Sequence, residues 1–80
     1  MSTNEKYMQD LAEHFLTAKD PESMNKILHG ILTPSELIEI SKRLQIFRLL
    51  ESGMPQRQIA EKLGVGIATV TRGSRALKNE

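Results

Sequence analysis

The chain has 80 residues, which is one small domain's worth and would bury only about 60% of its unfolded surface on its own. It has no cysteine, which excludes disulfides and thiolate metal sites, and no apolar run near the roughly 18 residues of a membrane span, so we expect a soluble, cytoplasmic protein. The formal net charge is only +1, so total charge gives no argument for a nucleic-acid partner.

The first third of the chain predicts two helices. Residues 4–18 carry an apolar stripe at helical spacing, made of Tyr7, Met8, Leu11, Phe15 and Leu16. Asp20 followed by Pro21 is typical of a helix start, with Asp20 as the N-cap. The second helix is short and is expected to end at Gly30. We expect it to bury Met24, Ile27 and Leu28.

A third, longer helix is predicted from a capping box. Thr33 and Glu36 have the required spacing, and Pro34 fits the first turn between them. The helix should run to about Glu51, where Ser52 and Gly53 stop it. Its inward side is expected to hold Leu37, Ile40, Leu44, Phe47 and either Leu50 or Ile46. The apolar residues of the chain thus follow helical periodicity, and an all-α fold is expected.

Residues 56–75, QRQIAEKLGVGIATVTRGSR, have the pattern of a helix-turn-helix motif. Pro55 opens the first helix, and Gly64 ends it at a turn that requires positive φ. The second helix covers residues 67–78. Small or apolar residues suited to the contact between the helices are Ile59, Ala60, Leu63, Val65 and Val70. Polar residues of the second helix that suit a DNA groove are Thr69, Thr71, Arg72, Ser74 and Arg75.

Charge is distributed unevenly along the chain. Residues 1–55 hold six Lys or Arg against eight Asp or Glu, a net charge of −2. Residues 56–80 hold five against two, a net charge of +3. The positive charge therefore gathers on the helix-turn-helix segment, where DNA phosphates would require it.

Gly73 departs from the helix-turn-helix pattern. The second helix of such a motif usually carries a bulky apolar residue at this point, which packs inward. A glycine is therefore expected to leave a gap beside Arg72 that a planar ligand could fill. The alternative is that Gly73 only weakens the helix, by about 1 kcal/mol.

Catalysis and metal binding find no support in the sequence. His14 and His29 lack Cys, Asp or Glu at metal-ligand spacing, and no nucleophile stands beside a base. Gly64-Val65-Gly66 is too short for a phosphate-cradling loop and follows no strand. We therefore expect no catalytic residues, no metal site and no enzyme activity.

Several short motifs together resemble the Trp repressor family. They are Leu32-Thr33-Pro34, Arg43, Gln56-Arg57, the run Gly66-Ile67-Ala68-Thr69-Val70-Thr71-Arg72-Gly73-Ser74, and Leu77-Lys78. The resemblance implies a five-helix, all-α domain with a C-terminal helix-turn-helix and an interlocked homodimer. The whole chain, 1–80, would form one domain. Residues 1–52 would be its core and dimerisation helices, and residues 55–78 its DNA-binding motif.

The same resemblance implies a small-molecule amino-acid ligand, L-tryptophan, acting as corepressor; no other cofactor is expected. The residues that match the family's ligand contacts are Arg43, Thr69, Arg72 and Gly73, with backbone groups near Leu32 and Thr33 of the facing subunit. Two flat guanidinium groups can sandwich an indole ring, and Arg72 can hold a carboxylate.

The family's contacts to double-stranded operator DNA fall on ten residues here. They are Gln56, Arg57, Gly66, Ile67, Ala68, Thr69 and Thr71, with phosphate contacts from Arg72, Arg75 and Lys78. Small residues at the start of the second helix let it approach the bases closely. Arg57 is the candidate for a bidentate contact to guanine.

The chain also departs from the family pattern. A DNA-contacting lysine of the family is Ala60 here, and a serine that contacts the corepressor amine is Ala76. The turn before Gln56 is one residue shorter, and the family's final helix has no counterpart before residue 80. These changes are expected to weaken or shift ligand binding without removing the Arg43–Arg72 pair.

These observations together predict a sequence-specific, homodimeric transcriptional repressor that controls tryptophan biosynthesis genes with L-tryptophan as corepressor. Two alternatives remain open. One is a related DNA-binding regulator without a tryptophan response, and the other is a protein-interaction module that uses the helix-turn-helix as a packing surface.

Overall fold

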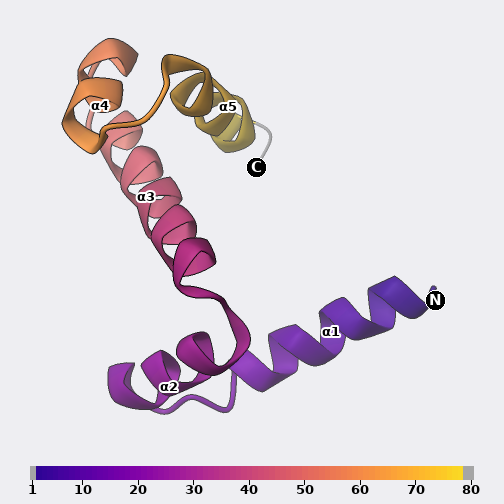
Figure 1. Ribbon diagram of the computed structural model, residues 1–80. Coiled ribbons are helices and arrows are strands. Elements are labelled where there is room, and N and C mark those ends of the chain that lie inside the picture. The colour runs from indigo at the N-terminus through magenta and orange to yellow at the C-terminus, as the bar shows by residue number, and fades with distance from the viewer. Residues whose placement is uncertain (1, 79–80) are drawn as a thin grey trace. The chain divides into compact units, whose positions relative to one another are not determined.

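The computed structural model describes residues 2–78 and consists of five helices (Figure 1). They are α1 (Thr3–Phe15), α2 (Pro21–Ile31), α3 (Pro34–Glu51), α4 (Gln56–Leu63) and α5 (Ile67–Lys78). No strand occurs among these residues, which confirms the predicted all-α fold class. The chain divides into two compact units, Met1–Leu37 and Ile38–Glu80, each described by itself below. No helix in the described range is long and apolar enough to cross a membrane.

Helix α1 begins at a side-chain cap and ends earlier than predicted. The Ser2 hydroxyl accepts a hydrogen bond from the Glu5 N–H at 3.2 Å. The helix ends at Phe15 rather than at Ala18. The Thr17 hydroxyl donates to the His14 carbonyl at 2.7 Å, and the Thr17 N–H bonds the same oxygen at 3.1 Å. A threonine that bonds nearby backbone groups competes with the helical pattern, which accounts for the earlier end.

Helix α2 starts as predicted but does not end at Gly30. The Ser23 N–H donates to Asp20 Oδ1 at 2.8 Å, the Asp20 N–H donates to Ser23 Oγ at 3.2 Å, and Pro21 lies in the first turn. Gly30 lies inside the helix, which ends at Ile31. The end falls there because the residue before Pro34 is disfavoured in helical conformation, so the chain extends from Leu32 onward.

The helices of the Met1–Leu37 unit bury little within one chain. Neither α1 nor α2 has a fully buried residue. In α1, Tyr7 is 63% exposed and Met8 69% exposed. The expected interior side chains of α2, namely Met24, Ile27 and Leu28, are only half-buried. Isolated helices of 11–13 residues are marginal in water, so these apolar stripes require further burial to be stable.

Helix α3 has the predicted capping box but a shorter buried face than expected. The Thr33 N–H donates to Glu36 Oε1 at 2.8 Å, and the Glu36 N–H donates to Thr33 Oγ1 at 3.2 Å. Ile46 is fully buried, while Leu37, Phe47 and Leu50 are half-buried. The expectation that Ile40 and Leu44 face inward is wrong for the single chain, since they are 45% and 46% exposed. The core begins only at Ile46, near the end of α3.

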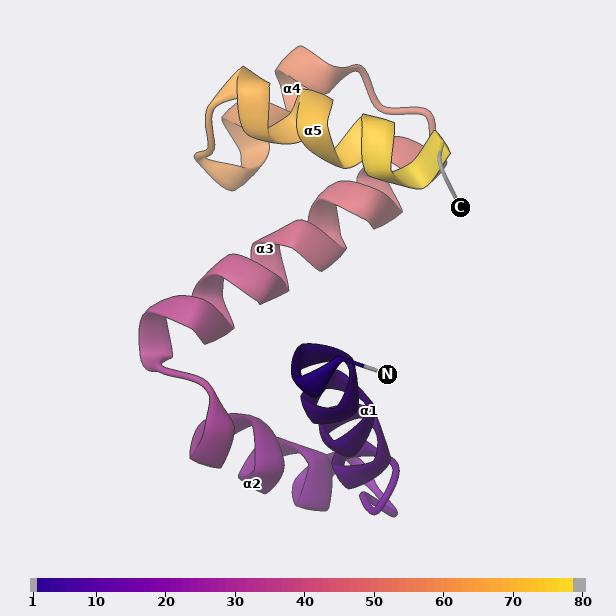
Figure 2. The same ribbon diagram turned by 90° about the vertical axis from the view of Figure 1, so that its right-hand side faces the viewer.

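The core of the Ile38–Glu80 unit joins α3, α4 and α5. Its fully buried side chains are Ile46, Ile59 and Val70, one from each helix. Full burial of each contributes about 1.5–3 kcal/mol. Half-buried residues that pack around them are Leu49, Leu50, Met54, Ala60, Leu63 and Val65. Both ribbon views show α4 and α5 together at the end of α3 (Figures 1 and 2).

The two capping boxes predict a specific acid sensitivity. Backbone N–H donors of Ser23 and Thr33 hold the pKa values of Asp20 and Glu36 below their usual 3.8 and 4.5. The unfolded chain therefore takes up more protons as the pH falls, so this stabilisation is complete above pH 4.5 and is lost as acid protonates the caps. The double variant Asp20→Asn/Glu36→Gln keeps uncharged acceptors in both capping positions. We expect it to lose less helical circular dichroism than the wild type in acid, and equal losses would contradict the assignment.

Candidate nucleic-acid interface

Helices α4 and α5 form the helix-turn-helix that the sequence predicts. Gly64 ends α4 in the left-handed region, with φ 66° and ψ 38°. The N–H groups of Gly64 and Val65 both bond the Ala60 carbonyl, which closes the end of the helix. Val65 then packs against the core, and α5 begins two residues later. The chain is thus turned tightly between two helices that share buried contacts.

The start of α5 presents small and apolar groups to solvent. Gly66, Ala68 and Thr69 are exposed, and Ile67 is 50% exposed. A Cβ built on Gly66 would meet nothing within 4 Å, and its φ is not in the left-handed region. The fold itself therefore does not require glycine at this point. The bare backbone leaves room for a partner to approach the first turn of α5 from outside.

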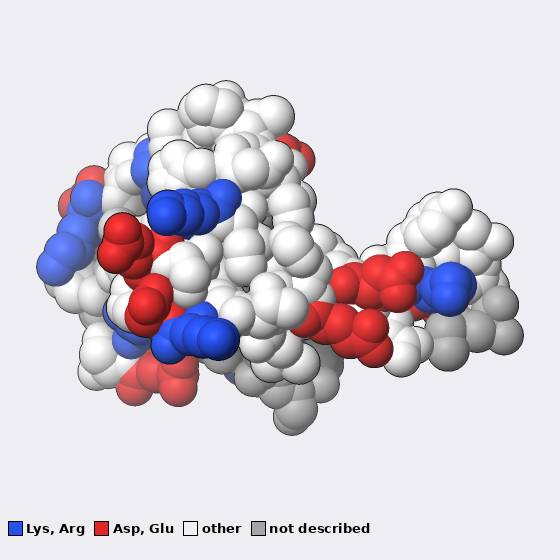
Figure 3. All heavy atoms as spheres, turned by 90° about the horizontal axis from the view of Figure 1, so that it is seen from below, with Lys and Arg blue, Asp and Glu red and all other residues white. Residues whose placement is uncertain are grey.

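Four of the exposed cations on α4 and α5 are predicted DNA contacts, namely Arg57 on α4 and Arg72, Arg75 and Lys78 on α5. The one ion pair within residues 2–78 joins Arg43 and Glu39 at 3.4 Å, so none of the four is held by an acidic group there. Figure 3 shows one face of the molecule, on which Lys and Arg are mixed with Asp and Glu. The helix-turn-helix therefore keeps its positive charge available to an anionic partner.

Two predicted DNA-contacting residues bond each other, which the sequence did not reveal. Thr71 Oγ1 donates to Gln56 Oε1 at 2.8 Å, and both side chains are half-buried. The bond joins the first residue of α4 to the second turn of α5. Residues 15 positions apart give no local signal for such a pairing.

Gly73 does not leave the expected gap in this chain. It is buried, and a Cβ at this position would lie 2.8 Å from Cγ2 of Ile46 and 3.6 Å from Cε1 of Phe47. The space expected to hold a ligand is thus occupied by a side chain of α3. Here the missing side chain lets α5 pack directly against Ile46.

The predicted ligand residues lie in both units. Arg43, Thr69 and Arg72 are exposed residues of the Ile38–Glu80 unit, and Gly73 is buried in the same unit. Leu32 and Thr33 belong to the Met1–Leu37 unit. Both backbone groups of Thr33 are engaged, since its N–H donates to Glu36 and its carbonyl accepts from Leu37 at 3.0 Å. By contrast, the predicted DNA-contacting residues all lie on α4, the turn and α5.

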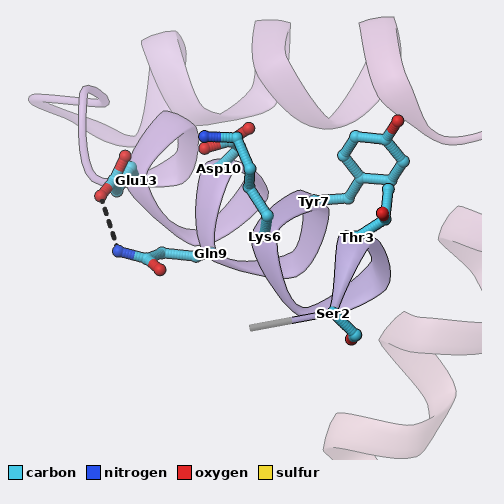
Figure 4. A pocket seen from close by; sticks show the side chains of 7 residues that line it. All are labelled: Ser2, Thr3, Lys6, Tyr7, Gln9, Asp10 and Glu13. Atoms are coloured by element: carbon cyan, nitrogen blue, oxygen red, sulfur yellow. Dashed lines mark hydrogen bonds between the residues drawn. The ribbon is translucent and has the colours of Figure 1, made fainter.

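Other features of the surface do not form a ligand site. A shallow hollow on α1 is lined by Ser2, Thr3, Lys6, Tyr7, Gln9, Asp10 and Glu13 (Figure 4). All of these come from one exposed helix and its N-cap residue, which do not enclose a small molecule as binding pockets do. The His29 imidazole is engaged within its own helix, since its Nδ1 lies 2.7 Å from the Asn25 carbonyl oxygen. No cluster of three potential metal ligands occurs in the described part of the chain.

A tight turn between two packed helices, with small groups and unpaired cations on the second, defines a DNA-binding protein of the helix-turn-helix class. A family model described as "Trp repressor protein" matches residues 6–80. The chain belongs to the Trp repressor family, as the sequence motifs predicted. It is a family of transcriptional regulators rather than enzymes.

Similar curated proteins are each named "Trp operon repressor homolog". The one from Vibrio parahaemolyticus serotype O3:K6 is 38% identical over 73 residues, covering 90% of this chain and 71% of that protein. The one from Vibrio atlanticus is 39% identical over 71 residues, covering 88% and 72%. The one from Aliivibrio fischeri strain MJ11 is 40% identical over 82 residues, covering 99% and 76%. The likeness therefore extends over nearly the whole chain.

The Gly73 contact can be tested with a matched pair of glycines. Gly73→Ala gains about 1 kcal/mol of helix propensity but overpacks a full core, which costs about 1–3 kcal/mol. We expect a net loss of about 1 kcal/mol in the free energy of unfolding. Gly30→Ala, also inside a helix but with open space around the new methyl, should stabilise by about 0.5–1 kcal/mol. Denaturant unfolding measures the free energy of unfolding of both variants. If both were stabilised equally, the Ile46 side chain would have moved aside at little cost, which would contradict a tight contact at Gly73.

Proposed function

We propose that this chain is a sequence-specific transcriptional repressor that binds operator DNA as a homodimer, with L-tryptophan as its corepressor. The observation that carries the proposal is the exposed start of α5, where Gly66, Ala68 and Thr69 stand beside unpaired cations. The family membership supports the same function. The ligand and the dimer are the finer parts of the proposal and are argued separately below.

Small side chains and a free helix start suit docking in the major groove of DNA. Ile67 and Ala68 offer apolar contact to thymine methyl groups, and Thr69 can bond a base edge. Arg57 on the preceding helix would contact guanine, while Arg72, Arg75 and Lys78 would neutralise phosphates. Gln56, Gly66 and Thr71 complete the proposed interface. Phosphate contacts position the protein, and the base contacts supply the sequence preference.

The proposed dimer rests on unburied apolar surface. The exposed residues of this kind on α1, α2 and α3 are Tyr7, Met8, Leu11, Ile31, Ile38, Ile40 and Leu44, and Leu16 caps the end of α1. Three fully buried side chains are a thin core for residues 2–78, and burial against a second copy would add the missing apolar contact. A two-fold dimer would present two copies of α5 to DNA, so the half-sites would be related by symmetry.

The proposed corepressor site uses the exposed guanidinium groups of Arg43 and Arg72. Arg43 lies one helical turn before Ile46, and Arg72 precedes Gly73, so both flank the contact between α3 and α5. An indole ring reaching Gly73 must displace Ile46 or move α5 away from α3. Binding would then shift the position of α5, the helix proposed to enter the DNA groove. A ligand that binds one of two arrangements more tightly shifts the population toward that arrangement. Thr69 of the same chain, and backbone groups near Leu32 and Thr33 of the facing subunit, would complete the site.

A regulator without a tryptophan response is the second candidate. Two observations favour it, namely that Ile46 fills the space beside Gly73 and that Ala76 offers no hydroxyl to a ligand amine. Such a protein would bind DNA equally well with and without the amino acid. The third class, a protein-interaction module, predicts DNA affinity that does not depend on salt. For a DNA-binding protein, each neutralised phosphate contributes about −0.9 to the slope of the logarithm of the binding constant against the logarithm of the salt concentration.

The DNA proposal is tested by selecting duplexes from a random library. We expect two-fold related half-sites about one helical turn, roughly 34 Å, apart, and a steep salt dependence of binding. Arg57→Ala should weaken binding to the selected duplex by about 1–3 kcal/mol and relax selection at one base pair. Arg48→Ala, which removes an exposed arginine from α3, is the matched control. A library without enrichment, or binding that ignores salt, would contradict operator recognition.

The ligand proposal is tested by isothermal titration with L-tryptophan, and by repeating the DNA-binding measurement with the amino acid present. We expect the wild type to bind L-tryptophan and to hold the selected duplex more tightly in its presence. Arg43→Ala should lower ligand affinity by about 1 kcal/mol or more because one face of the indole loses its cation. Arg48→Ala again serves as the control on the same helix. The absence of binding heat together with unchanged DNA affinity would leave the regulator without a tryptophan response.

A further inference from the structure

A half-buried hydrogen bond joins the two helices of the motif, from Thr71 Oγ1 to Gln56 Oε1 at 2.8 Å. We propose that Thr71 is a positioning residue, which holds the carbonyl end of the Gln56 amide so that the amide nitrogen is presented to a phosphate oxygen of DNA. This inference rests on the proposed DNA-binding function. It assigns Thr71 an indirect role instead of a separate contact to DNA.

The hydroxyl group of Thr71 is already committed within the chain. It carries one proton and has two acceptors in reach, Gln56 Oε1 at 2.8 Å and the Ile67 carbonyl at 3.0 Å. Phosphate oxygens only accept hydrogen bonds. Thr71 can therefore donate to a phosphate only by giving up both internal bonds, which makes direct donation unfavourable.

Gln56, in contrast, retains free donors. An amide whose oxygen accepts from Thr71 still has two N–H groups on its nitrogen. Gln56 is also the first residue of α4, and Pro55 before it gives no side-chain cap. The bond to Thr71 thus fixes a long side chain that nothing else at the start of α4 anchors. A side chain ordered before binding loses less conformational entropy when it contacts DNA.

A double-mutant cycle on the selected operator duplex tests the pair. Thr71→Val and Gln56→Met remove the polar groups while nearly keeping side-chain size. We expect each single variant to lose about three- to tenfold in affinity. The double variant should lose no more than the weaker-binding single variant, because both changes remove the same interaction. Thr71→Ser, which keeps the hydroxyl, should restore most of the affinity.

The control cycle pairs Gln56→Met with Thr69→Val. Thr69 is a threonine of the same helix, but two residues along a helix correspond to a rotation of about 200°, so it lies on the other side of α5 from Thr71. In this cycle the fold-losses in DNA affinity of the two single variants should multiply in the double variant, since the two side chains act on DNA separately. Thermal unfolding of every variant fixes a temperature at which all are folded, so that a stability effect is not read as a binding effect.

A second measurement does not need DNA. The side-chain amide signal of Gln56 in the nuclear magnetic resonance spectrum should shift in Thr71→Val and stay near its wild-type position in Thr71→Ser. Multiplicative losses for Thr71→Val and Gln56→Met would overturn the positioning role while leaving DNA binding intact. A wild type that binds no duplex would overturn both the role and the proposed function, whatever the amide signal shows.

Discussion

Three β-branched side chains, Ile46, Ile59 and Val70, fix the arrangement of the helix-turn-helix. Each comes from a different helix, and they are the fully buried hydrophobic residues of the described chain. Few rotamers are open to β-branched side chains, so their packing leaves little freedom in how α4 and α5 meet the end of α3. Every residue of the proposed interface is placed by this contact, because the exposed start of α5 is the outer side of the helix that buries Val70.

Ile46 also sets the distance between α3 and α5 through its contact with Gly73. A buried glycine brings the backbone of α5 against a side chain of α3, and a methyl group there would stand 2.8 Å from Ile46 Cγ2. Close-packed contacts of this kind switch between arrangements rather than deforming gradually. Under the proposed function, a ligand bound beside Gly73 would therefore change the position of α5 directly, because the ligand and Ile46 would occupy the same space.

Much of the fold was predictable from local signals. The caps at Asp20 and Thr33 and the turn at Gly64 depend on residues within one helical turn, and each occurs as predicted. The structure differs from the prediction where a local signal competes with another constraint. Gly30 predicts a helix end, but α2 continues to Ile31 and stops before the proline that follows Thr33. Periodicity predicts that Ile40 and Leu44 face inward, but it shows only that a face is apolar and not whether this chain alone covers it.

The contacts that define the site required tertiary structure. The motif around Arg72 and Gly73 identified the family and the interface helix, yet it could not show that Ile46 meets Gly73, because a missing side chain looks the same in a sequence whether a ligand or the protein fills the space. The single chain fills it with Ile46. Ligand affinity in the proposed site must then include the free energy of displacing that side chain. A metabolite would act here by competing with the protein's own core, which makes the Ile46–Gly73 contact, more than the pair of arginines, the element that decides whether the chain responds.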